Sequence, residues 1–142
     1  MAETAMWFIL LSHLEDFLAG ILTAAVSQGF TRGENYPSVC PAIRLYRRGE
    51  PDLDVWSRPK GKLEIIAELW VKNDDPDPKV ANQALAELEK AFQDALVLWP
   101  VQAGSDLKLK ITDMNFSGVN GDNENYRPHA AAFYGLRINW AK

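Results

Sequence analysis

The segment Leu63–Lys72 constrains the fold more than any other part of the chain, because apolar side chains occupy every second position. These apolar residues are Leu63, Ile65, Ala67, Leu69 and Val71. The positions between them carry Glu64, Ile66, Glu68, Trp70 and Lys72. Successive side chains of a strand point to opposite faces, so the pattern predicts a strand in a sheet that is covered on one face only.

An apolar stripe at helical spacing occupies the beginning of the chain. Its members recur at steps of three or four residues and are Trp7, Leu11, Leu14, Leu18, Leu22 and Ala25. The stripe predicts a helix from about Ala5 to Gln28, ended by Gly29. Phe8 and Ile9 fall on the polar side of this helix, which predicts that both contact something outside the domain.

A second helix is predicted after an acidic turn. Asp77 followed by Pro78 matches an N-cap residue with proline at the first helical position. The apolar stripe that follows consists of Leu85, Leu88, Phe92, Ala95 and Leu96. We expect this helix to stop near Trp99, because Pro100 disfavours helical geometry in the residue before it.

Three further strands are predicted, with polar connections between them. The strands are expected at Val39–Arg48, Leu107–Phe116 and Ala130–Trp140, and the connections at Gly49–Gly61 and Ser117–Pro128. The expected fold is α+β: a four-stranded, mainly antiparallel sheet with two helices packed on one face, in the order α-β-β-α-β-β. The 142 residues form a single expected domain, 1–142.

Composition narrows the class of protein. The net charge of −4 disfavours a duplex-binding protein, which usually carries a basic excess. A single cysteine, Cys40, is unable to form an intramolecular disulfide, which fits a reducing compartment. The apolar start, Met6–Leu11, lacks a basic leader and is followed at once by polar residues. We therefore expect neither a signal peptide nor a membrane span there. The protein is expected to be cytoplasmic.

The uncovered face of the expected sheet mixes aromatic, arginine and acidic residues, a composition closer to an interface than to a solvated surface. The residues expected there are Arg44, Tyr46, Glu64, Ile66, Glu68, Trp70, Lys108, Lys110, Phe133 and Arg137. Aromatic pairing across strands is the plainer alternative for any one of them. The set as a whole favours an interface.

No combination of residues predicts an enzyme, a metal site or a cofactor. Cys40 has no base beside it in sequence, and a free cysteine usually behaves as a small buried apolar residue. His13 with Asp16 offers only two metal ligands, and His129 has no partner histidine at ligand spacing. The polar stretch 120–125 resembles a calcium loop, but Ala131 stands where a bidentate glutamate is needed. Turn formation explains that stretch more simply.

The order of elements resembles the tail terminator and tail completion proteins of long-tailed bacteriophages, the minor tail protein U-like group. The similarity lies in the long first helix, the strand segments 41–46 and 63–71, the helix around 85–89, and the closing segments 111–116 and 134–140. It implies a protein that forms a homo-oligomeric ring, commonly a hexamer, on the end of the tail tube. Such a ring stops tube polymerisation and meets the head-tail joining proteins, without making or breaking a bond. The implied location is the host cytoplasm during assembly and then the virion tail.

Interface candidates follow from the polar side of the first helix and from the open sheet face. They are Phe8, Ile9, Arg44, Tyr46, Ile66, Trp70, Phe133 and Arg137. Trp70→Ala is expected to impair assembly and leave folding largely intact. An alternative is a nucleic-acid-binding α+β module that uses the open sheet face, although Glu64 and Glu68 in the middle of that face oppose specific nucleic-acid binding.

Overall fold

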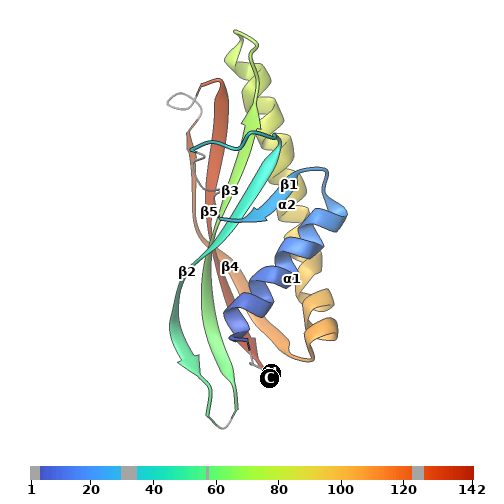
Figure 1. The fold of residues 1–142 in the computed structure, drawn as a ribbon, viewed down its shortest axis with the longest axis vertical. Coiled ribbons are helices and arrows are strands. Elements are labelled where there is room, and N and C mark those ends of the chain that lie inside the picture. Colours follow the sequence, from blue (N-terminus) through green and yellow to red (C-terminus); the bar gives the residue numbers. More distant parts are fainter. Residues whose placement is uncertain (1–3, 30–34, 57, 123–126) are drawn as a thin grey trace.

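The computed structural model describes residues 4–29, 35–56, 58–122 and 127–142. Two helices and five strands follow one another along the chain (Figure 1). They are α1 (Met6–Ile21), β1 (Ala25–Gln28), β2 (Ala42–Asp54), β3 (Lys60–Lys72), α2 (Pro78–Leu107), β4 (Lys110–Asp122) and β5 (His129–Ala141).

The five strands form one mixed sheet in the order β1-β2-β3-β5-β4. β1 runs parallel to β2, and every other neighbouring pair is antiparallel. The predicted four-stranded, mainly antiparallel sheet and its element order α-β-β-α-β-β are therefore wrong. The register of the edge strand β4 against β5 shifts twice, between Ile111 and Asp113 and between Phe116 and Gly118.

The missed strand β1 comes from residues that the apolar stripe had assigned to the first helix. α1 ends at Ile21, and the backbone of Leu22 is already extended. The Ala25 N–H then donates to the Pro41 carbonyl at 2.9 Å, and the Gly29 N–H donates to the Leu45 carbonyl at 2.8 Å. Hydrogen bonds to β2 thus decide the conformation of this segment, and they outweigh its local helical pattern.

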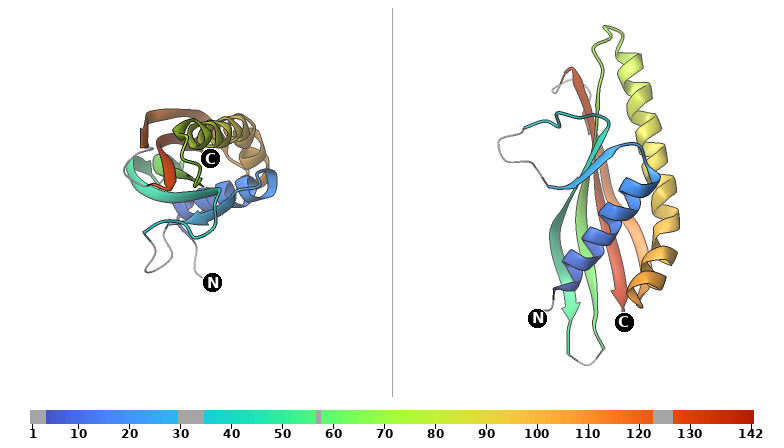
Figure 2. Two further views of the ribbon diagram at one scale, coloured as in Figure 1. Left: turned by 90° about the horizontal axis from the view of Figure 1, so that it is seen from above. Right: turned by 45° about the vertical axis from the view of Figure 1, so that its right-hand side comes forward.

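The hairpin of β2 and β3 is longer than predicted. The expected polar connection from Gly49 to Gly61 is mostly paired strand, with Asp54 opposite Lys60. This end of the hairpin projects beyond the helices (Figures 1 and 2), so it has no buried face to impose alternation of apolar and polar residues. β4 likewise continues past the predicted end at Phe116 as far as Asp122.

Helix α2 begins as predicted and ends later. Asp77 is its N-cap, and its side chain accepts a hydrogen bond from the Lys79 N–H at 3.0 Å. Pro100 does not end the helix, because buried Trp99 and Ala103 on either side of the proline hold both halves against the core. The helix ends at Lys108, which adopts a left-handed conformation with φ of 55°.

Both helices pack on the same face of the sheet (Figure 2), where one apolar core joins them to the strands. The predicted alternation in β3 is confirmed, since Leu63, Ile65 and Leu69 have no exposed area. His13 links the helices: its Nδ1 accepts a hydrogen bond from the Trp99 indole at 3.0 Å, and its Nε2 lies 2.8 Å from Asp106. Within the described ranges, neither helix combines the length and apolar character needed to cross a membrane.

Candidate interaction surfaces

The open face of the sheet carries a hydrogen-bonded group at the end of β3, here named the Trp70 cluster: Arg44, Tyr46, Glu68 and Trp70. The carboxylate of Glu68 accepts hydrogen bonds from the Tyr46 hydroxyl and from the Trp70 indole, each at 3.0 Å. Arg44 lies opposite Glu68 on β2, and its guanidinium carbon is 5.9 Å from the centre of the Trp70 ring. Glu68 is therefore buried with its carboxylate hydrogen-bonded.

Three effects raise the pKa of Tyr46 to about 12. Burial, the largest, disfavours the charged phenolate, and the hydrogen bond to Glu68 and the negative charge of Glu68 both favour the neutral phenol.

The Trp70 cluster is covered by the segment 35–41. The Tyr36 ring meets Trp70 edge to face at 5.7 Å and stacks on His129 at 5.1 Å between ring centres. Trp70 and Arg44 are each only 3% exposed, so these two interface candidates lie inside the protomer. The expectation that this end of the face is uncovered is wrong, because a loop without strand character folds over it. Any interface role of these two residues stays a prediction.

Three predicted residues, Ile66, Phe133 and Arg137, lie half-buried on the rest of the open face, with Phe133 beside Trp70. Arg137 and Glu64 form an ion pair at 2.9 Å across β5 and β3. Ile66 and Phe133 line a hollow of about 210 Å³ beside the cross-strand pair of Gly118 and Gly135. A Cβ at Gly135 would lie 2.4 Å from Ser117 Oγ, so a side chain there would force Ser117 to move.

The remaining predicted residues lie elsewhere. Phe8 is 44% exposed and Ile9 half-buried, both on α1 and therefore on the helical side of the sheet. Lys108 caps α2 and does not belong to a strand. The stretch 120–125, compared above with a calcium loop and read as a turn, lies partly outside the described residues, since residues 123–125 are not described. The open-face residues and the α1 residues thus form two separate surfaces.

Sequence reasoning missed two exposed apolar surfaces. The first is the tip of the β2–β3 hairpin, where Leu53, Val55 and Trp56 are 47%, 57% and 91% exposed. The second runs along α2 and β4 and consists of Val97, Leu98, Val101, Phe116 and Val119. A signal for the second was present, because Val97 and Val101 stand one helical turn apart on the polar side of α2.

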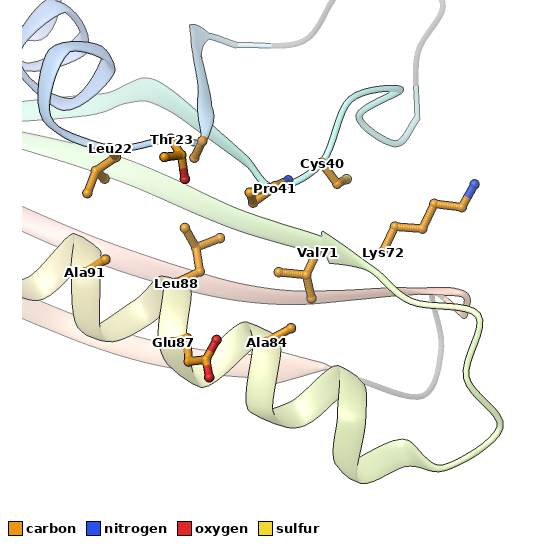
Figure 3. A pocket seen from close by; sticks show the side chains of 11 residues that line it. Leu22, Thr23, Cys40, Pro41, Val71, Lys72, Ala84, Glu87, Leu88 and Ala91 are labelled. Carbon is orange, nitrogen blue, oxygen red and sulfur yellow. The ribbon is translucent and has the colours of Figure 1, made fainter.

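A hollow of about 340 Å³ lies between α2 and the neighbouring ends of β1 and β3 (Figure 3). Its walls are mainly apolar, with Leu22, Val71 and Leu88 among them, and Cys40 lies at one side. Burial raises the pKa of the Cys40 thiol, which keeps the thiol in its less reactive protonated form. Among the described residues, no three His, Cys, Asp or Glu side chains lie close enough to hold a metal ion.

No protein-family model matches this chain, and no curated protein matches it. Among solved structures, a chain in the structure titled "Virion of native gene transfer agent (GTA) particle" has a similar fold. The superposition has a TM-score of 0.52 and covers 96% of this chain and 92% of that chain, with 10% sequence identity. At that identity the likeness shows a shared fold.

Proposed function

We propose that this protein is a structural component of a phage or phage-like particle. It assembles with copies of itself into a ring on the end of a tail tube, stops polymerisation of the tube, and provides the surface that meets the head. The observation that carries this proposal is the shared fold with a virion chain, which extends over nearly the whole length of both proteins. The element pattern that resembles tail terminator proteins supports the finer assignment.

The distribution of exposed side chains supports assembly as the activity. A ring requires two different surfaces on each copy that fit each other, because neighbours meet head to tail. The hairpin tip and the α2/β4 surface lie on different parts of the fold and are both apolar. The half-buried part of the open face, with Ile66, Phe133 and Arg137, is a third surface and is the proposed contact with the tube.

The proposed role is not enzymatic. His13 is engaged with Trp99 and Asp106, and the carboxylate of Glu68 is engaged with Tyr46 and Trp70. These contacts join elements of the fold to one another. Such an arrangement stabilises the protomer instead of activating a substrate.

Light scattering coupled to size exclusion, over a wide concentration range and with and without purified tail tubes, tests the proposal. We expect growth toward a closed ring at high protein concentration or on addition of tubes. A strict monomer that also ignores the tube would overturn the proposal. Salt-sensitive retention on DNA or RNA in the same experiment would favour the nucleic-acid-binding alternative instead.

A further inference from the structure

The tip of the β2–β3 hairpin carries an apolar group that is largely exposed in the described part of the chain. Leu53, Val55 and Trp56 form this tip, and Trp56 is 91% exposed. Tryptophan is enriched among the residues that dominate binding energy in protein interfaces. An apolar tip at the end of a projecting hairpin therefore has the chemistry of an anchor that enters a pocket in a partner.

Two contacts partly order the tip in the free protein. The Asp54 carboxylate accepts a hydrogen bond from the Trp56 N–H at 2.9 Å, which closes a turn. At the base of the tip, Leu53 and Trp140 close over Gly61, where an added Cβ would lie 3.1 Å from Leu53 Cδ1 and 3.0 Å from Trp140 Nε1. Ordering before binding lowers the entropy lost when an interface forms.

An apolar groove of about 330 Å³ lies between α2 and β4. Its apolar lining includes Leu96, Val97, Pro100, Ile111, Met114 and Phe116. Val97 and Phe116 are 76% and 40% exposed, and Val101, one turn further along α2, is 80% exposed. The groove and this strip of α2 therefore form a continuous apolar surface on the side opposite the β1–β2 edge of the sheet.

We infer that the hairpin tip of one copy docks into the α2/β4 groove of a second copy. Each chain carries both halves of the contact, and β3 and β5 separate β2 from β4, so the halves lie toward opposite sides of the sheet. A contact between different surfaces of identical copies is heterologous and closes a ring when the rotation permits. This inference rests on the proposed function and identifies the contact between ring neighbours.

The area of the tip indicates how such copies associate. An aromatic side chain buries about 150–250 Å², and with Val55 and Leu53 the tip exposes roughly 350 Å² of apolar surface. A standard interface takes about 800 Å² from each partner. One tip contact is therefore weak, whereas a copy in a ring makes two such contacts, one through its tip and one through its groove. Dimers are expected to be sparse and closed rings cooperative.

Four variants test this contact by sedimentation equilibrium of the full chain up to high concentration. Trp56→Ala removes the anchor, and Val97→Lys places a charge in the groove. Val39→Ala and Val80→Lys are matched controls at exposed apolar positions outside both surfaces. We expect Trp56→Ala and Val97→Lys each to weaken self-association by about 30-fold or more, the effect of one interface hot spot, and both controls to associate as the wild type does.

A mixture of the two damaged variants gives a sharper test. The Val97→Lys copy retains an intact tip and the Trp56→Ala copy retains an intact groove, so the mixture restores one contact per pair. At the highest concentrations we expect the mixture to form a small fraction of dimers, clearly more than either variant forms alone, and no larger species. Circular dichroism melts identical to the wild type show that the variants fold. Equal association of all variants, or an absence of complementation, would overturn the inference.

The result also separates this contact from the proposed function. Rings on tail tubes that form equally well with Trp56→Ala would overturn the docking contact and leave the ring proposal standing. Self-association that depends on Trp56, in a protein that does not bind tubes, would support the docking contact and overturn the proposed role at the tail tube. A wild-type chain that stays monomeric at every concentration, yet binds tubes through Trp56, would show that the tip takes a different partner, and would also overturn the inference.

Discussion

Trp70 and Trp56 lie near opposite ends of the same β2–β3 hairpin and differ in almost every respect. Trp70 is 3% exposed, packs against Phe133, and donates a hydrogen bond to Glu68. Trp56 is 91% exposed, and its backbone N–H donates a hydrogen bond to the Asp54 carboxylate. One hairpin thus uses a tryptophan at one end to stabilise the protomer and presents another at the far end to the surroundings. The comparison separates residues that maintain the fold from residues available for assembly.

The largest effect is expected from truncating the buried tryptophan. The sequence predicts that Trp70→Ala leaves folding largely intact, but Trp70 is buried in the structure. We therefore expect Trp70→Ala to lower the free energy of unfolding by about 3–5 kcal/mol, because it leaves a cavity and removes a donor from Glu68. Trp56→Ala is expected to change it by no more than about 0.5 kcal/mol, as for other exposed positions. Urea denaturation of both variants measures this. Similar losses of stability in the two variants would break the comparison.

A smaller effect is expected from two glutamates on the open face of β3. Glu68→Gln weakens hydrogen bonds to a buried carboxylate and is expected to cost about 1.5–3 kcal/mol of unfolding free energy. Glu64→Gln weakens a partly exposed ion pair with Arg137 and is expected to cost about 0.2–1 kcal/mol. Chemical denaturation at neutral pH and moderate salt measures both. An equal loss of unfolding free energy in the two variants would show that the contacts of Glu68 stabilise the fold no more than the ion pair of Glu64 does.

The smallest effect is expected from alkaline titration of Tyr46. Its pKa in the folded protein is about 12, against an ordinary value of 10.0, so the folded state holds the phenolic proton more tightly. The stabilising contribution is complete below about pH 10 and is lost as the pH rises toward 12. Tyr134 has a similarly raised pKa, because it is buried and donates to Glu89, so it must be replaced by phenylalanine in the background protein.

In that background, Tyr46→Phe is expected to flatten the decline of unfolding free energy between pH 10 and 12. Ultraviolet titration of the phenolate gives an independent measure. A Tyr46 that ionises near pH 10 in the folded protein would show that the Trp70 cluster is more open than its burial indicates.

The sequence predicted those parts of the fold in which burial on one side imposes a pattern. Leu63–Val71 alternate because one face of β3 meets the helices, and Leu85 to Leu96 recur at helical spacing because α2 packs on the sheet. β1 was missed because four extended residues, Ala25–Gln28, carry no pattern of their own and are fixed by hydrogen bonds to β2. The end of α2 was predicted wrongly because the local effect of Pro100 on helix geometry is weaker than the stabilisation from burying Trp99.

The candidate surfaces were predicted less well than the fold. Membership of the open face follows from alternation, so Ile66, Phe133 and Arg137 were found. Whether a loop folds over that face depends on tertiary contacts, and Tyr36 against Trp70 has no signature in sequence. The hairpin tip was overlooked because Trp56 stands among charged and turn-forming residues, where composition suggests a solvated loop.

The two register shifts in β4 bear on how readily copies of this chain would aggregate through a sheet edge. A long, regular outer strand offers an unbroken row of N–H and C=O groups, on which further chains can add as strands and grow into insoluble aggregates. The irregularities between Ile111 and Asp113 and between Phe116 and Gly118 interrupt that row at two places. Growth by strand addition at this edge is thereby discouraged.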